Sequence, residues 1–462
     1  MLERAPFLYK EMEKGIILFA MNEPIIALAT PPLNGAIAML RCSGNRVFEI
    51  ADSLFSKNVS ETKTRSILVG NLKDGDRTID QVVLLVYPGP NTMTGEDVLE
   101  ICCHGSMLIV EEIVQAFLSR GARYATRGEF SSRAFYNGKM DLIEAEAVND
   151  LINATTVESK NLALLSLTGE TSKLVAPLKE EIASLLALLE VNIDYPEYTD
   201  IEEANSLLLE SRAKEIRMHL ASLIEQGQEG KIIREGVKVA LVGSPNAGKS
   251  SLLNALLKQD KAIVSAIPGT TRDIVEGELS VKGVPLHLLD TAGIRASSDE
   301  IESIGVERSK KAIEEADLVI LVVDASKGMS EEDKEILNAS KGKKTIVCFN
   351  KSDLIYNKDK GVLYTSALQG DVTKLKEAIF DSLSLSSSSF KTPSFSNARE
   401  LGLLREIDGY LKEVVDGAKD NLAADLISIP LQEAYHCVQK LLGMDPSQDL
   451  GDEIFSRFCV GK

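Results

Sequence analysis

The chain has 462 residues, of which 44% are hydrophobic, and its 51 Lys and Arg against 69 Asp and Glu give a formal net charge of −18 at pH 7. This length is too great for one ordinary core and predicts about three domains. The acidic balance argues against an independent binder of nucleic acid, so an RNA partner would be met by a local basic patch or by a second protein.

Cysteine usage and hydropathy favour a cytoplasmic protein. The six cysteines lack the paired C-x-x-C spacing of a structural zinc site, a pattern that fits a reducing compartment. No apolar run approaches the length of a membrane span, and the stretch from Gly15 to Met21 is too short for a signal peptide. Residues 1–20 are expected to be an N-terminal tail.

Residues 21–139 predict a small α+β domain. The runs IIALAT, AIAML and VVLLVY are expected to form strands between Gly and Pro punctuation. Cys102, Cys103 and His104 are interpreted as part of another strand rather than as a metal site. From residue 120 to 139, five Lys and Arg against one Glu give a local charge of 5 − 1 = +4. This segment predicts an anion site, with a solvated basic loop as the alternative.

Helical sequence flanks a central α/β region. Residues 140–234 are rich in Ala, Leu and Glu, and residues 399–462 share their helical periodicity. One apolar face of the first stretch consists of Leu174, Leu178, Ile182, Leu185 and Leu189. The Ser-rich residues 386–398 predict an exposed linker.

Residues 235–385 alternate strands, glycine loops and helices: VKVALVG, HLLDTAG, ADLVILVVDAS, KTIVCFN and VLYTSA are the expected strand regions. Such apolar runs indicate a mostly parallel sheet with helices on both faces. The predicted fold is therefore an α/β domain inserted in an all-α helical domain, after a small α+β domain.

A phosphate-binding loop opens the α/β region. Residues 243–250 match the pattern GxxxxGK[ST] and stand between the strand VKVALV and the helix SSLLNALL. Backbone N–H groups of such a loop and the helix N-terminus bind phosphates, Lys249 adds a positive charge, and Ser250 offers an oxygen to Mg²⁺.

Two later motifs predict a guanine nucleotide. Residues 290–293, Asp-Thr-Ala-Gly, follow a strand, where the acid can hold Mg²⁺ through water and Gly293 can approach the γ-phosphate. Residues 350–353, Asn-Lys-Ser-Asp, end another strand, and the Asp353 carboxylate matches the two donors on the guanine edge, which adenine lacks. Residues 365–367 are placed to bind guanine O6 through backbone N–H.

A switch segment and a missing glutamine define the expected chemistry. Residues 265–273 include Thr271, whose hydroxyl is the best candidate to complete the Mg²⁺ shell. Ile294 stands where Ras-type enzymes carry the glutamine that orients the attacking water. Another group must do so, and the candidates from the residues alone are Asp299, Glu300 and Glu302, with a solvated acidic loop as the alternative.

The assembled motifs resemble one family, the tRNA modification GTPases called MnmE or TrmE. The resemblance covers the chain from about residue 21 to 462. It rests on ALATPP, TGEDVLE, GEFSSRAF, NGKMDL, the inserted GTP-binding region with GTTRD, and the terminal CVGK.

The resemblance implies a potassium-stimulated GTPase in which K⁺ takes the place of an arginine finger. By resemblance the K⁺ ligands are Asn246, Ser265, Ile267 and Thr270, the Mg²⁺ ligands are Ser250 and Thr271, and the catalytic residues are Glu302, which orients the water, and Cys459, whose chemical role stays open. The GTP-binding residues expected are Asn246, Ala247, Gly248, Lys249, Ser250, Ser251, Ser265, Ala266, Ile267, Pro268, Gly269, Thr270, Thr271, Asp290, Thr291, Ala292, Gly293, Asn350, Lys351, Asp353, Ser366 and Ala367.

The resemblance also implies a tetrahydrofolate one-carbon carrier, 5-formyl- or methylene-tetrahydrofolate, in the N-terminal domain. Its ligands map to Arg41, Glu100, Lys139 and Lys462. A pterin offers amide-like donors suited to a carboxylate, and the glutamate tail suits cations.

The implied assembly is a homodimer through the N-terminal domain, with pairing of the GTP-binding domains in the GTP state. An FAD-dependent subunit of the MnmG type would form a heterotetramer and supply redox chemistry and much of the tRNA contact, which fits the −18 charge. No membrane is involved. The alternative is a GTP-regulated ribosome or RNA assembly switch without base-modifying activity, which would share the GTP motifs but not the N-terminal domain or CVGK.

Overall fold

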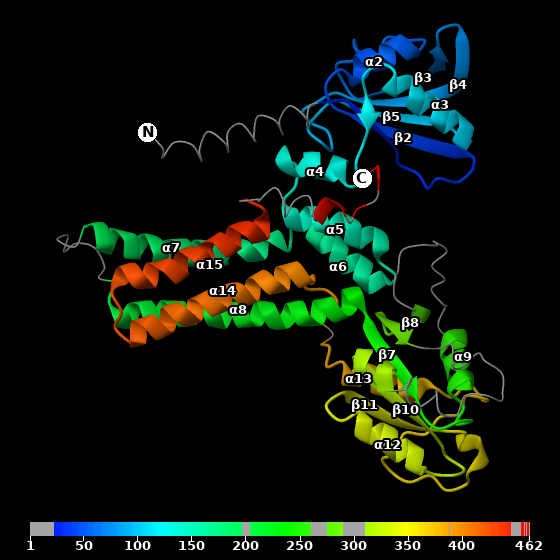
Figure 1. Ribbon diagram of the computed structural model, residues 1–462, viewed down its shortest axis with the longest axis vertical. Helices are drawn as coiled ribbons and strands as arrows, with labels where there is room; N and C mark the ends of the chain where they lie inside the picture. Colours follow the sequence, from blue (N-terminus) through cyan, green and yellow to red (C-terminus); the bar gives the residue numbers. More distant parts are fainter. Residues whose placement is uncertain are drawn as a thin grey trace. The chain divides into compact units, whose positions relative to one another are not determined.

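A computed structural model of the chain describes residues 23–195, 204–259, 275–289, 310–386, 388–444, 454–456, 458, 460 and 461 (Figure 1). The chain divides into two compact units. The first contains Met1–Asn149 and Leu442–Lys462, and the second contains Asp150–Leu441. The predicted tail, residues 1–20, lies outside the described residues, and the predicted domain limits stay a prediction.

The first unit is built on a six-stranded sheet with the order β3-β4-β5-β2-β1-β6. Its strands are β1 (Ile25–Leu28), β2 (Ile37–Ser43), β3 (Ser66–Asp74), β4 (Arg77–Tyr87), β5 (Val98–His104) and β6 (Arg123–Tyr124). All neighbours pair antiparallel except β1 and β6, which are parallel. The three strand runs expected from the sequence are confirmed, as is the strand through Cys102 and His104.

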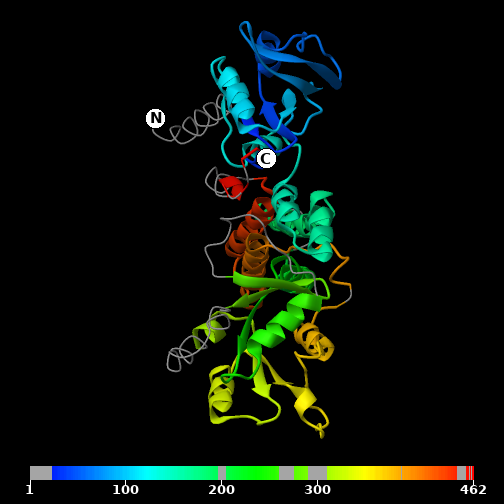
Figure 2. The same cartoon turned by 90° about the vertical axis from the view of Figure 1, so that its right-hand side faces the viewer.

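Strand alternation gives the two faces of this sheet different roles. Leu40, Leu84 and Leu99 are buried on one face, where helices α2 (Val47–Leu54) and α3 (Met107–Leu118) cover them (Figure 2). Successive side chains of a strand point to opposite faces, so Arg41 and Glu100 belong to the other face. These two residues are direct cross-strand partners.

Ion pairs tie the edge of the sheet to helix α4 (Glu129–Tyr136). The Arg133 side chain is 1% exposed and binds Glu96 at 2.9 Å and Glu129 at 2.8 Å. Arg123 also binds Glu129, at 2.6 Å, and Arg120 binds Asp74. These three arginines of the segment 120–139 are therefore already paired with carboxylates of the same unit, and the predicted anion site would rest on other cations of the segment, such as Lys139.

The C-terminal residues complete the first unit. Ile454, Phe455 and Phe458 join Phe135 and Leu142 in a small apolar cluster that includes the start of helix α5 (Leu142–Asn153). A side chain at Gly128 would collide with the carbonyl of Phe455, so this close approach requires glycine.

The second unit contains a helical part in which α8 (Ser206–Glu235) and α14 (Ala398–Lys419) lie side by side (Figure 1). The other helices are α6 (Val157–Leu167), η1 (Ser172–Leu174), α7 (Val175–Asp194) and α15 (Ala424–Leu442). The expected apolar face of α7 is confirmed at Leu178, Ile182, Leu185 and Leu189, but Val175 is buried in place of Leu174, which precedes the helix.

A five-stranded sheet is inserted between α8 and α14, with the order β11-β10-β7-β9-β8. Its elements are β7 (Val237–Val242), α9 (Lys249–Gln259), β8 (Val275–Val281), β9 (Val284–Leu289), β10 (Leu318–Asp324), α12 (Glu331–Ala339), β11 (Lys344–Asn350), η2 (Ser352–Leu354) and α13 (Thr373–Ser382). All pairs are parallel except β8 with β9. Separate apolar clusters on the two faces confirm the predicted α/β fold inserted in a helical domain.

Two expectations about this unit are wrong. The run VLYTSA forms two isolated bridges, Tyr364 with Phe349 and Ser366 with Asp371, rather than a continuous strand. The Ser-rich segment is not an exposed linker, because Phe395 is 1% exposed and packs beside Gly227 of α8. A side chain at Gly227 would overlap the Phe395 carbonyl, so this close approach requires glycine, which the Ser-rich composition does not reveal.

No helix among the described residues is long and apolar enough to cross a membrane. The same residues contain no cluster of three or more His, Cys, Asp or Glu side chains that could hold a metal ion. Cys102, Cys103 and His104 lie in β5, and His104 binds the Asp80 carboxylate at 2.8 Å.

The ion pairs of Glu129 predict a pH-dependent stability. Burial alone would raise the pKa of Glu129, but hydrogen bonds from Arg123, Thr126 N–H and Arg133 outweigh it and lower the pKa from 4.5 to about 2. The ionised carboxylate therefore stabilises the fold above pH 4.5, and this contribution is lost as the pH falls from 4.5 to 2. We expect Glu129→Gln to cost about 3 kcal/mol at pH 7.

Calorimetric unfolding of the wild type and Glu129→Gln at a series of pH values measures this difference. The gap between the two proteins should shrink steadily below pH 4.5. A gap that stays constant down to pH 2.5 would contradict the assignment of the stabilisation to the ionised carboxylate.

Candidate nucleotide site and N-terminal cavity

The phosphate loop lies where the sequence places it, between β7 and α9. Residues 243–248 form the loop, and Lys249 is the first residue of the helix. Gly243 has φ 144° and a side chain there would overlap the carbonyl of Val322, while Gly248 has φ 93° and lies against Asn350. The loop can follow this path only with glycine at both positions. Its backbone N–H groups and the N-terminus of α9 suit a polyphosphate.

Lys249 is held on the loop that precedes it. Its Nζ donates to the carbonyl oxygens of Gly243 at 2.8 Å and Ser244 at 3.0 Å. Burial lowers the pKa of Lys249, and the nearby carboxylates of Glu332 and Asp333 oppose that shift. The ammonium is therefore positioned at the loop by the protein itself, where its charge favours an anionic ligand.

Asn350 joins three parts of the site. The residue is 1% exposed at the end of β11, and its Nδ2 donates to the Ala247 carbonyl at 3.1 Å. Its Oδ1 accepts from the Ala367 N–H at 3.1 Å. Asn350 thus links the phosphate loop to residues 365–367. This structural role is additional to its predicted role in binding the nucleotide.

The other motif residues are also fixed by neighbours. Lys351 has φ 64° and its Nζ binds the Asp324 carboxylate at 2.7 Å. Burial acts to raise the pKa of Asp324, but hydrogen bonds from Lys351 and Ser326 prevail and lower it. Ser366 Oγ donates to Asp353 Oδ1 at 2.5 Å, which orients the carboxylate expected to read guanine.

The predicted GTP-binding residues that the structure describes lie at the carboxyl ends of β7 and β11 and in the neighbouring segment 365–367, where ligands of open parallel sheets bind. They are Asn246, Ala247, Gly248, Lys249, Ser250, Ser251, Asn350, Lys351, Asp353, Ser366 and Ala367. The remaining predicted residues lie outside the described residues, and their roles stay predictions: Ser265, Ala266, Ile267, Pro268, Gly269, Thr270, Thr271, Asp290, Thr291, Ala292, Gly293, Glu302, Cys459 and Lys462.

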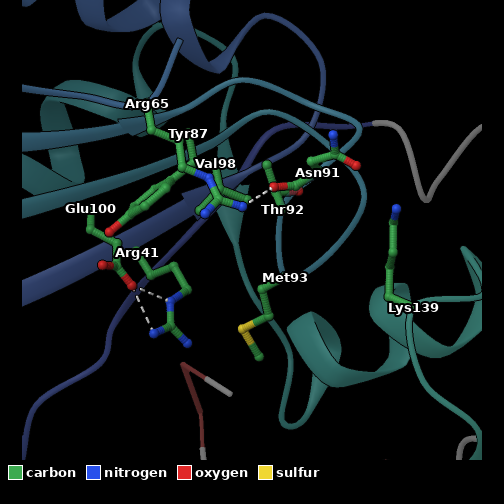
Figure 3. A pocket seen from close by; sticks show the side chains of 9 residues that line it. All are labelled: Arg41, Arg65, Tyr87, Asn91, Thr92, Met93, Val98, Glu100 and Lys139. Atoms are coloured by element: carbon green, nitrogen blue, oxygen red, sulfur yellow. Dashed lines mark hydrogen bonds and ion pairs between the residues drawn. The ribbon is translucent and has the colours of Figure 1, made fainter.

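The N-terminal sheet carries a separate cavity of about 760 Å³ on the face opposite α2 and α3. Arg41 and Glu100 lie on one side of it and Lys139 on the other (Figure 3). Three of the four predicted carrier ligands thus line one cavity. The volume is within the usual range for sites of small organic ligands.

Arg41 organises the floor of this cavity. Its Nε and Nη2 both bind Glu100 Oε1, at 2.9 Å and 2.8 Å. Its Nη1 donates to the Gly461 carbonyl at 3.1 Å. The C-terminal segment therefore reaches the cavity through Arg41, although the sequence separates them by 420 positions.

Sequence reasoning missed the other residues that line the cavity: Arg65, Tyr87, Asn91, Thr92, Met93 and Val98. Arg65 Nη2 donates to the Asn91 carbonyl at 2.7 Å, so the segment before β3 closes one end. The stretch PGPNTMTGED overlaps the motif TGEDVLE. Its run of turn-forming residues close to Glu100 could have indicated a loop that binds a ligand.

Comparison with known proteins finds relatives along nearly the whole chain. Residues 24–139 match the family described as the GTP-binding protein TrmE N-terminus, and residues 142–459 match the MnmE helical domain. The tRNA modification GTPases MnmE of Enterococcus faecalis and Lactiplantibacillus plantarum are 41% and 42% identical, each over 95% of this chain and 98% of the relative. That of Bacillus subtilis is 40% identical over 95% of this chain and 100% of the relative.

Proposed function

The chain belongs to the MnmE family of tRNA modification GTPases, and we propose that it works with an FAD-dependent partner to install the (carboxymethyl)aminomethyl group at C5 of the wobble uridine of certain tRNAs. As a member of that family it is a GTP hydrolase that acts in tRNA modification. The proposal adds the reaction, the carbon donor, the cations and the assembly.

One observation carries the proposal: the cavity with the Arg41–Glu100 pair and the nearby C-terminal segment occurs in the same chain as the guanine site. A nucleotide switch alone would not need a second cavity lined by three cations and a carboxylate. The carboxylate and cations favour a ligand with N–H donors at one end and carboxylates at the other.

A tetrahydrofolate derivative fits this lining. Both Arg41 contacts use Glu100 Oε1, and among the described residues no hydrogen bond reaches Oε2, which can accept from the amide-like N–H groups of a pterin. Tyr87, Met93 and Val98 supply apolar surface for the ring system, and Arg65 and Lys139 supply charge for the glutamate tail. The bound carrier would provide the one-carbon unit, and Lys462 and Cys459 complete the proposed site.

The residues at the phosphate loop suit the two proposed cations. Mg²⁺ prefers oxygen ligands, and Ser250 at the start of α9 offers one, with Thr271 as the proposed second. Asn246 is exposed on the loop at φ 61° and offers an amide oxygen for K⁺, with Ser265, Ile267 and Thr270 as proposed partners. A cation there would neutralise charge that develops on the transferring phosphoryl group, while Glu302 orients the water.

The proposed assembly is a homodimer through the N-terminal domain, with pairing of GTP-binding domains in the GTP state, joined to a flavoprotein of the MnmG type. Two features support a division of labour. The net charge of −18 disfavours strong RNA binding by this chain alone. Three basic residues of the segment 120–139 already form ion pairs with carboxylates. We place this assembly in the cytoplasm, with the partner making much of the tRNA contact.

A ribosome or RNA assembly switch is the second candidate, since it would use the same GTP motifs. The cavity of the N-terminal sheet favours the first proposal over this one. Affinity capture from one lysate discriminates between them: the tRNA-modifying enzyme should retain tRNA and a flavoprotein, and an assembly switch should retain ribosomal subunits.

Loss of the carboxylate in the cavity should separate modification from GTP hydrolysis. We expect Glu100→Gln to bind 5-formyl-tetrahydrofolate about tenfold or more weakly, because the amide cannot accept from two ligand donors with the strength of a carboxylate. Mass analysis of wobble nucleosides in cells that carry only this variant should show loss of the modified uridine, while the purified variant keeps its GTPase rate.

Glu49→Gln is the matched control, because Glu49 also pairs with an arginine, Arg46, but on the exposed surface. Normal wobble nucleosides in the Glu100→Gln cells would contradict the proposed carbon donor site. If the wobble uridine stayed modified both in the variant and in a deletion strain, the proposed reaction itself would be contradicted.

Hydrolysis should depend on the alkali cation. We expect GTP turnover at least about tenfold faster in potassium than in sodium at equal ionic strength, because a cation at the position of an arginine finger stabilises the transition state. Asn246→Ala should remove this stimulation and keep GDP binding. Equal rates in the two salts for the wild type would show that Asn246 has no such role.

A further inference from the structure

Helix α12 has a buried acidic residue in its first turn. Its first turn reads Ser330-Glu331-Glu332-Asp333, in which Ser330 caps the helix and Asp333 reaches back to it. Asp333 Oδ2 accepts from Ser330 N–H at 3.0 Å and from Ser330 Oγ at 2.7 Å. This arrangement is a capping box. Asp333, however, is only 1% exposed.

The second oxygen of Asp333 binds the phosphate loop. Oδ1 accepts from the backbone N–H of Ser244 at 2.9 Å, across 89 positions of sequence. Ser244 is the second residue of the loop. A hydrogen bond from a backbone N–H to a buried carboxylate is charge-assisted and costly to remove, because the N–H is then left without an acceptor.

The carbonyl of the same residue is held as well. The Ser244 carbonyl accepts from Lys249 Nζ at 3.0 Å and from Ala247 N–H at 3.3 Å. Two residues further on, Asn246 adopts φ 61°, a left-handed conformation that asparagine tolerates better than most residues with a side chain. Asp333 thus anchors the entry of a loop that turns sharply at its middle.

We infer that Asp333 is a positioning residue for nucleotide binding: its carboxylate fixes Ser244 and so holds the phosphate loop in the conformation that receives the polyphosphate. Asp333 acts through the loop and is assigned no contact with the nucleotide. Because the loop binds the phosphates common to GDP and GTP, loss of the anchor should weaken both nucleotides to a similar extent.

Two reciprocal substitutions separate this role from simple stabilisation of α12. Asp333→Ser keeps a capping box, since Ser159 fills the corresponding position of α6 in this chain, but its hydroxyl is one atom shorter and leaves Ser244 N–H without its acceptor. Ser330→Ala removes the cap from the other side and leaves the Asp333–Ser244 contact in place.

The measurement is the dissociation rate of a fluorescent GDP from the full-length protein by stopped flow, with the melting temperature recorded for each variant. We expect Asp333→Ser to release GDP about tenfold faster than the wild type and also to lower the melting temperature, because a buried charge-assisted hydrogen bond is lost. Ser330→Ala should lower the melting temperature and release GDP at the wild-type rate.

Glu332→Ala controls for charge, because Glu332 also acts on the Lys249 ammonium but makes no hydrogen bond with the loop among the described residues. GDP release at the wild-type rate from Asp333→Ser would overturn the inference. It would equally be overturned if Glu332→Ala or Ser330→Ala accelerated release as much as Asp333→Ser, because charge or helix stability would then explain the effect.

Discussion

The nucleotide site depends on one buried carboxamide. Asn350 donates to the carbonyl of Ala247 in the phosphate loop and accepts from the N–H of Ala367, so a single side chain sets the distance between the part that binds phosphate and the part expected to bind the base. A buried amide with both ends bonded is specific in geometry, because either bond left unmade is costly. Gly248 permits this contact, since a side chain there would occupy the space of Asn350.

A comparable constraint shapes the N-terminal cavity. Alternation along β2 and β5 sends Leu40 and Leu99 to the core under α2 and α3 and brings Arg41 against Glu100 on the opposite face. Arg41 also binds the carbonyl of Gly461, which places this residue at the proposed carrier site. The buried Arg133, bonded to Glu96 and Glu129, holds the loop before β5 and helix α4 together around that cavity.

The sequence predicted what depends on short stretches of chain. The phosphate loop is recognisable because its glycines, its strand and its helix are contiguous, and Asn350 and Asp353 stand in one motif. That Arg65 and Tyr87 line the cavity could not be predicted. Their positions depend on the pairing of β4 with β5 and on the path of a distant loop. Ser-rich composition concealed the burial of Phe395, and the Asp333–Ser244 contact follows from packing between elements far apart in sequence.

The central claim is that the site at the ends of β7 and β11 selects guanine through Asp353, which Ser366 orients. Calorimetric titration of Asp353→Asn with GDP and with xanthosine diphosphate tests it most directly, with Asp359→Asn, an exposed acid on the following loop, as control. The account predicts that the variant prefers xanthosine diphosphate by about 100-fold or more, because its amide can donate to the second carbonyl of xanthine. A variant that keeps the wild-type preference for GDP would contradict it.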